Sequence, residues 1–223
     1  MKISLKKIIF VQDISNAKLM EFKKLIDRGA ELERMNEALH REDTQFVVIY
    51  GRRRIGKSEL IKRIVKARHK ATYFLSDTSS ETVQRVAFSK VAASVIDGFD
   101  KVIYPDWETL FRSFNNQLSE RMLVCLDEFP YLVKSCDVLP SIIQKLLNEK
   151  ILKFDLILCG SSQQLMHGYV LNRQSPLYGL ANEIIKMQPI PARYTSMAME
   201  CDAVQAVEEY AIWGGVPRYW ELS

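Results

Sequence analysis

Short apolar runs alternate along this chain with segments of helical periodicity. Five runs have the length and the β-branched content of buried strands: residues 45–50, 71–76, 122–129, 154–162 and 183–190. Because each run is almost continuously apolar, we expect both faces of the corresponding strand to be covered.

Helices are predicted between these runs. In residues 27–39, Leu32, Met35 and Leu39 share one face, and residues 57–69, 139–148 and the segment after residue 202 have similar stripes. TSSE at 78–81 predicts a capping box for a helix bearing Val83, Val86 and Val91, and Asp106 predicts an N-cap for the helix that begins at Trp107. The alternation predicts an α/β domain with a parallel sheet covered on both faces.

Composition excludes few functions. Of 223 residues, 48% are hydrophobic, which favours a packed core over disorder. Lys and Arg number 31 against 27 Asp and Glu, and this net charge of +4 does not by itself indicate nucleic acid or membrane binding.

The predicted location is the cytoplasm. The four cysteines lack metal-ligand spacing, which favours a reducing compartment. The first apolar run, residues 8–11, is too short for a secretory signal, and no later run reaches membrane-spanning length. Residues 1–26 are Lys-rich, and we assign them no role.

The strongest chemical signal is GRRRIGKS at residues 51–58, which matches the phosphate-loop pattern G-x-x-x-x-G-K-[ST]. The glycines permit a tight turn whose N–H groups form an anion nest at a helix N-terminus. Lys57 would reach the β- and γ-phosphates, and the Ser58 hydroxyl would bind Mg²⁺. The predicted nucleotide-binding residues here are Gly51, Arg52, Arg53, Arg54, Ile55, Gly56, Lys57, Ser58 and Glu59.

Two interpretations of this loop are possible from the sequence. An ordinary Gly-rich turn would also join a strand to a helix, but the flanking strand and helix satisfy the context that the motif requires. The three arginines either raise the positive potential around a triphosphate or extend into solvent. We favour solvated side chains for at least two of them, because the nest acts through its backbone.

Asp127 and Glu128 follow an apolar strand, at the end of a parallel sheet where ligands bind. Asp127 would hold Mg²⁺, and Glu128 would act as the base for a water that attacks the γ-phosphate. The alternative is a pair of acids at a strand end, which is less expected seventy residues after a phosphate loop.

The strand at 71–76 separates the two motifs, which suits phosphate-loop ATPases with an extra strand and a strand order of 5-1-4-3-2. A guanine-reading Asn/Thr-Lys-x-Asp element is missing, which disfavours a GTPase.

Ser161 and Ser162 end the strand expected between the two motifs. They either sense the γ-phosphate and orient the water, as we assign to Ser161, or cap a helix.

Together with GRRRIGKS, the segments LDEFPYL (126–132), LILCGSS (156–162), SPLYGL (175–180) and YAIWGGVPRYWEL (210–222) resemble the archaeal-type ATPase family. This family, also found in bacteria, belongs to the signal-transduction (STAND) branch related to AAA+ ATPases. The resemblance spans residues 27–222.

The resemblance implies an ATP-binding core, residues 27–192, followed at 193–223 by the start of a helical lid or winged-helix segment that continues beyond this chain. It also implies that Arg28 lies near the base and that Pro217 contacts the nucleotide from the lid. The family has an arginine where this chain has Leu180, which puts hydrolysis more in doubt than binding; Arg173 or Arg193 are candidate substitutes.

Two functions remain open at this point. The first is a Mg-ATP-dependent ATPase that acts as a conformational switch, with Lys57, Glu128 and Ser161 as catalytic residues and Ser58 and Asp127 as metal ligands. The second is an ATP-binding scaffold with little hydrolysis that regulates a DNA-binding or nuclease-like region. DNA or a protein partner would then be engaged through residues beyond 223, with no membrane involved; the oligomeric state is not indicated.

Overall fold

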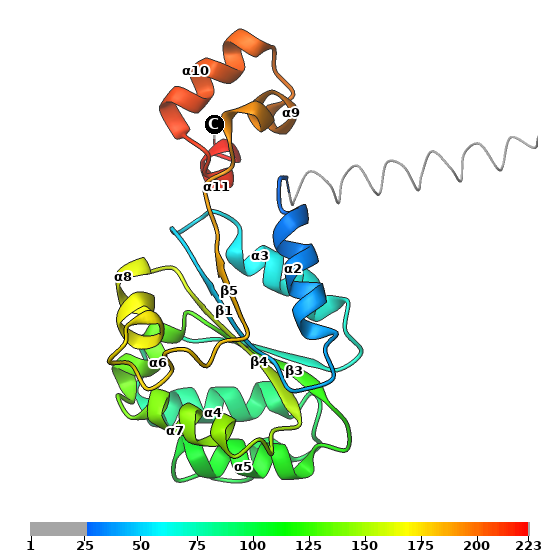
Figure 1. The fold of residues 1–223 in the computed structure, drawn as a ribbon, viewed down its shortest axis with the longest axis vertical. Coiled ribbons are helices and arrows are strands. Elements are labelled where there is room, and N and C mark those ends of the chain that lie inside the picture. The colour runs from blue at the N-terminus through cyan, green and yellow to red at the C-terminus, as the bar shows by residue number, and fades with distance from the viewer. Residues whose placement is uncertain (1–25, 223) are drawn as a thin grey trace, which may run out of the picture.

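The computed structural model describes residues 26–222, so the predicted extension lies outside the described residues except for Ile26. Five parallel strands form one sheet in the order β2-β3-β4-β1-β5. Their bounds are β1 Phe46–Tyr50, β2 Ala71–Leu75, β3 Met122–Asp127, β4 Phe154–Gly160 and β5 Glu183–Lys186. Both the predicted fold class and the strand order are confirmed (Figure 1).

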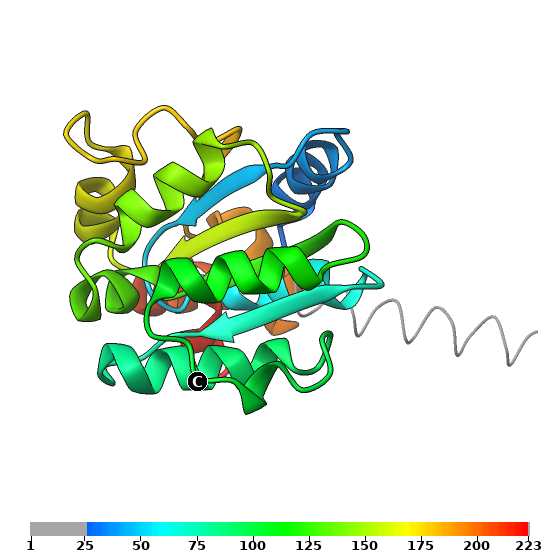
Figure 2. The same ribbon diagram turned by 90° about the horizontal axis from the view of Figure 1, so that it is seen from below.

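The sheet is sandwiched between two layers of helices (Figures 1 and 2). One layer contains α4 (Glu81–Ala92), α5 (Trp107–Gln117), α6 (Phe129–Ser135), α7 (Leu139–Asn148) and α8 (Gln163–Met166), and the other α2 (Gly29–Leu39) and α3 (Lys57–Lys66). Residues of β3 and β4 are buried throughout, as expected for strands covered on both faces.

An aromatic cluster fills the core between the sheet and α4 and α5. The ring of Phe88 makes edge contacts with Phe74, Trp107, Phe111 and Phe114, at centroid distances of 5.6 to 5.9 Å. Such edge-to-face pairs stabilise a core beyond the area that they bury. This cluster is what orients α4 on the sheet.

Helix α4 does not bury the face that carries Val83 and Val86. Val83 and Val86 are 54% and 47% exposed, whereas Phe88 and Ala92 are buried. The large Phe88 ring determines the rotation of the helix, because its burial outweighs that of two valines.

The predicted capping box is wrong, since the N-cap residue Ser80 makes no side-chain hydrogen bond to α4. The predicted Asp106 cap of α5 is confirmed by a 2.7 Å hydrogen bond from the Thr109 N–H.

The C-terminal segment lies above the carboxyl ends of the strands (Figure 1). It contains α9 (Thr195–Met199), α10 (Ala203–Trp213) and α11 (Pro217–Trp220). The Ile190 N–H donates a 2.8 Å hydrogen bond to the Gly215 carbonyl, and Val216 is buried with the residues of α2 and α3. A Cβ at residue 215 would lie 1.9 Å from the Ile190 carbonyl oxygen, so this contact requires glycine.

Candidate nucleotide-binding site

The loop between β1 and α3 has the backbone expected of a phosphate loop. Gly56, the N-cap of α3, has a φ of 94° and leaves the helix without a side-chain cap, so the first N–H groups of α3 stay available to an anion. Gly51 begins the loop, where a Cβ would lie 2.5 Å from the Met187 carbonyl oxygen. Both positions therefore favour glycine: residue 51 because a Cβ would clash, and residue 56 because its φ is positive.

Lys57 points its amine along this loop. Its Nζ donates hydrogen bonds to the carbonyls of Gly51 (3.0 Å) and Arg52 (2.8 Å), and the residue is only 5% exposed. Burial lowers the pKa of Lys57, partly opposed by nearby acids that include Glu128 and Asp127. An incoming phosphate would supply the charge that these neutral carbonyls lack.

Asp127 ends β3 directly beside the loop. Its Oδ2 accepts hydrogen bonds from the Ser58 hydroxyl (2.7 Å) and the Tyr73 hydroxyl (2.6 Å), and its Oδ1 accepts one from the Glu128 N–H (2.8 Å). The residue is 1% exposed, so these donors replace the water that a buried carboxylate has lost. Sequence reasoning missed Tyr73, because nothing in the apolar run of β2 marks this tyrosine as a hydrogen-bond donor and not a core residue.

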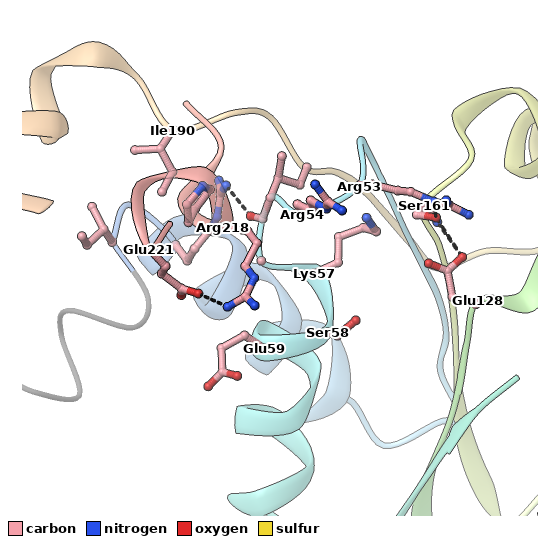
Figure 3. Close-up of a pocket in the computed structure, with 15 residues that line it drawn as sticks. Arg53, Arg54, Lys57, Ser58, Glu59, Glu128, Ser161, Ile190, Arg218 and Glu221 are labelled. Atoms are coloured by element: carbon pink, nitrogen blue, oxygen red, sulfur yellow. Dashed lines mark hydrogen bonds and ion pairs between the residues drawn. The ribbon is translucent and has the colours of Figure 1, made fainter. Parts of the chain in front are cut away.

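Glu128 lies between the last residue of β3 and the first residue of α6. It has a φ of 54°, a left-handed conformation that is uncommon outside glycine and that turns its side chain away from the strand direction. Its Oε2 accepts hydrogen bonds from the Ser161 hydroxyl (2.9 Å) and the Ser161 N–H (3.2 Å), as Figure 3 shows. Ser162 caps α8 through the Leu165 N–H, which is the helix-cap alternative considered for the two serines, whereas Ser161 contacts Glu128.

The three loop arginines differ in their surroundings. All are exposed, but Arg53 donates to the Ser161 hydroxyl (3.2 Å) and the Tyr131 hydroxyl (2.8 Å). The guanidinium of Arg54 lies 5.4 Å from the centre of the Tyr219 ring in α11. At least two of the three were expected to be no more than solvated, which does not hold for Arg53 and Arg54 because each has a partner from another element.

A cavity of about 540 Å³ connects these groups with the C-terminal segment (Figure 3). Arg28 lies at its edge, 3% exposed, and donates to the carbonyls of Ile55 (3.0 Å) and Gln188 (2.8 Å). The predicted site residues that line it are Arg28, Arg53, Arg54, Ile55, Gly56, Lys57, Ser58, Glu59, Glu128, Ser161 and Pro217. Gly51, Arg52 and Asp127 lie outside this lining.

Sequence reasoning missed Arg218 and Glu221 in α11, which also line the cavity and form a 2.6 Å ion pair with each other. The available signal was that Arg218 follows the Gly-Val-Pro turn directly. Only the docking of Val216 into the core brings this short helix over the loop.

The residues present fit a magnesium ion. A serine hydroxyl and a carboxylate oxygen are hard oxygen donors of the kind that Mg²⁺ prefers, with its remaining ligands usually supplied by water and phosphate. Within residues 26–222, no group of three or more His, Cys, Asp or Glu residues could hold a metal.

Leu180, which stands in place of the arginine implied by the resemblance, packs against the aromatic core. Neither Arg173 nor Arg193 lines the cavity. Arg193 instead lies over the Tyr194 ring, 4.8 Å from its centre, and 4.0 Å from an Asp27 carboxylate oxygen. The cations that line the cavity are Arg28, three residues of the loop and the start of α3, and Arg218 of α11.

A family model described as an ATPase domain predominantly from Archaea matches residues 25–220. The chain belongs to this family. This ATPase domain is 32% identical over 199 residues to an uncharacterized protein of Methanocaldococcus jannaschii. The match covers 88% of the chain but 43% of that protein, so the chain spans less than half of this relative's length.

Solved structures share the fold of this ATPase domain. A Walker-type ATPase of Pyrococcus abyssi superimposes with a TM-score of 0.59 and 22% identity, covering 87% of this chain and 65% of that one. The ORC1 protein of Aeropyrum pernix, solved in complex with DNA, gives a TM-score of 0.57 and 17% identity, with coverages of 84% and 53%. Both likenesses concern the fold.

Among residues 26–222, no helix is long and apolar enough to cross a membrane.

Proposed function

We propose that this domain binds Mg-ATP and hydrolyses it, and that the hydrolysis drives a conformational switch. The observation that supports this most directly is the 2.7 Å contact between Ser58 and Asp127 beside the uncapped N-terminus of α3. A phosphate nest and a pair of magnesium ligands adjoin there, as phosphoryl transfer requires.

The proposed roles follow from position. The N–H groups of residues 51–58 and the Lys57 amine would hold the phosphates, and Ser58 and Asp127 would hold Mg²⁺, whose charge would neutralise that of the phosphates. Glu128 takes a proton from the attacking water, and Ser161 keeps its carboxylate aimed into the cavity. Arg28 and Pro217 line the part of the cavity assigned to the base.

The C-terminal segment is the proposed moving part. We assign residues 27–192 to the core and 193–223 to the start of a lid, and the contact of Arg54 with Tyr219 joins the two. Because the phosphate loop and the lid share this contact, a change in the ligand of the loop would alter the position of α11. A cytoplasmic location fits this role, and DNA or a protein is the proposed partner of a longer protein.

One experiment tests hydrolysis separately from binding. Replacement of Glu128 by Gln removes the base but keeps the size of the side chain, so we expect ATP to bind within about threefold of wild type while turnover falls at least a hundredfold. Binding is measured by equilibrium dialysis with labelled ATP, and turnover by phosphate release. A Gln variant that hydrolyses ATP at the wild-type rate would exclude Glu128 as the base.

A scaffold that binds ATP with little hydrolysis is the second candidate. Leu180 favours it, because the position where the resemblance implies an arginine has no cation. The two hydrogen bonds from Ser161 to the Glu128 carboxylate also favour it, because they occupy the oxygen that would otherwise accept the proton of a water. Phosphate release from wild-type protein, with and without DNA, separates the two candidates. Steady turnover near the usual range of about 1 per second or more would exclude the scaffold.

A further inference from the structure

A second cavity, of about 460 Å³, lies next to the first. Three residues line both cavities, namely Arg53, Glu128 and Ser161. The second cavity is lined in addition by Arg52, Tyr131 and Lys134, among others. Arg53 and the Glu128–Ser161 pair therefore form the boundary between the two spaces, as their position at one end of the first cavity in Figure 3 also indicates.

The charge of this second cavity is unbalanced. It is lined by three cations, Arg52, Arg53 and Lys134, and by one carboxylate, that of Glu128. None of the three cations forms an ion pair within the part of the chain that the structure describes. Arg53 is held instead by two neutral hydroxyls, and the Lys134 amine lies 5.7 Å from the centre of the Tyr131 ring. An anion in this cavity would meet a net positive charge, because three cations line it with one carboxylate.

Arg53 is also oriented before any ligand arrives. Its Nε donates to Ser161 and one terminal nitrogen donates to Tyr131, so the planar guanidinium is fixed between β4 and α6. The other terminal nitrogen has no hydrogen-bond partner in residues 26–222. A guanidinium held in this way loses little rotamer entropy when it binds a phosphate oxygen.

The chemistry of the proposed reaction directs a phosphate toward this cavity. A bond forms between the water oxygen and the γ-phosphorus, and the bond to the bridging oxygen breaks with its electron pair remaining on ADP. The proton of the water passes to the Glu128 carboxylate and then to solvent. Because attacking and leaving oxygens are roughly in line, the phosphorus moves toward the water, and hence toward Glu128 and Ser161.

We infer that the second cavity receives the orthophosphate product and that Arg53 and Lys134 hold it after cleavage. This inference rests on the proposed function. Once its bond to ADP is broken, the phosphate lies beside the boundary formed by Arg53, Glu128 and Ser161, where Arg53 and then Lys134 of the second cavity attract it. The second cavity therefore provides a route by which phosphate leaves while ADP stays in the first.

The test measures binding of ³²P-labelled orthophosphate to the Mg-ADP-loaded protein by equilibrium dialysis, and so does not depend on turnover. Lys134 is exposed in α6 and has no proposed part in ATP binding, so Lys134→Glu should leave the affinity for Mg-ADP unchanged. Reversal of its charge should weaken phosphate binding by about tenfold or more at low salt. The matched control, Lys90→Glu, makes the same charge change on the exposed side of α4 and should alter phosphate binding less than twofold.

The outcomes separate the two proposals. If Mg-ADP does not bind, the proposed function fails. If Mg-ADP binds but phosphate shows no saturable binding, or binds equally to the wild type and to Lys134→Glu, only the product site is excluded. A parallel experiment replaces orthophosphate with a single-stranded DNA oligonucleotide. Binding of DNA that depends on Lys134, without such dependence for orthophosphate, would overturn the inference, because the cavity would then take a phosphodiester.

Discussion

The Ser58 hydroxyl lies 2.7 Å from Oδ2 of Asp127, although 69 positions separate the two residues in the chain. Strands β1 and β3 lie on either side of β4, and because all three are parallel their carboxyl ends adjoin at the same end of the sheet. The hydrogen bond connects the two parts of the proposed magnesium site, and replacement of either residue should affect metal binding before it affects the fold.

Ser58→Ala removes the hydroxyl ligand and should raise the Mg²⁺ concentration needed for half-maximal Mg-ATP binding by about tenfold or more. Ser58→Thr keeps the hydroxyl and is the matched control, since the motif accepts either residue. A magnesium titration followed by binding of a fluorescent ATP analogue measures the change. Equal magnesium dependence of the Ala and Thr variants would contradict a role for Ser58 as a ligand.

Lys57→Ala should weaken ATP binding by about 10- to 100-fold, because a charged hydrogen bond to phosphate contributes roughly 1.5–3 kcal/mol. Equilibrium dialysis with labelled ATP gives the dissociation constant. The control is Lys66→Ala, which removes an exposed amine from the last turn of the same helix. If both variants bind ATP as well as wild type does, the loop is not a phosphate site.

Tyr73→Phe tests the second donor to Asp127. Burial and the hydrogen bond to Asp127 raise the pKa of the Tyr73 hydroxyl, so that it remains a donor across the neutral range. Loss of one such bond, worth about 1 kcal/mol, should weaken magnesium binding roughly fivefold and lower the free energy of unfolding by a similar amount.

The control for that variant is Tyr178→Phe, which alters a tyrosine that is 48% exposed. Chemical denaturation and the magnesium titration are measured on both variants. If Tyr73→Phe lowered stability but left the magnesium dependence unchanged, Tyr73 would have a structural role only.

Gly215→Ala should detach the C-terminal segment from the core. The new Cβ would lie 1.9 Å from the Ile190 carbonyl oxygen and 2.6 Å from its nitrogen, so the 2.8 Å hydrogen bond between these residues must break. We expect ATP affinity to fall, and the free energy of unfolding to decrease by about 1–3 kcal/mol.

Gly29→Ala is the control, since nothing lies within 4 Å of its added Cβ and alanine favours the helix that begins there. Thermal unfolding and ATP binding are measured for both variants. Hydrogen exchange in residues 203–213 should rise in Gly215→Ala alone. Unchanged exchange there would mean that the contact at Ile190 does not hold the segment in place.

The strands were predictable because their signal is local. An apolar run flanked by polar turns, such as residues 154–162, predicts a strand that is covered on both faces, and this holds for β3 and β4. It does not hold for the edge strands β2 and β5, where Leu75 is 57% and Ile184 42% exposed. Strand ends were less accurate: the predicted runs continue past Asp127 and Gly160, where the chain leaves the sheet to form α6 and α8. The left-handed turn at Glu128 depends on this change of direction and has no signal in the sequence.

The rotation of a helix was not predictable where its residues compete for the core. In α4, valines and a phenylalanine offer alternative apolar faces, and Phe88 takes the core because four aromatic rings from β2 and α5 surround it. Three of these rings come from α5, so only the packing of that helix decides which face of α4 is buried.

The sequence by itself determined most strands and helices of this protein and predicted a phosphate loop, because a strand signal and a loop motif depend on residues close together in the chain. The tertiary structure alone decided which distant side chains share that site. The hydrogen bonds from Tyr73 to Asp127 and from Arg53 to Ser161 join different elements, and Arg218 of α11 lines the same cavity as the loop between β1 and α3. Their geometry follows from strand order and from the docking of Val216, which no short segment specifies.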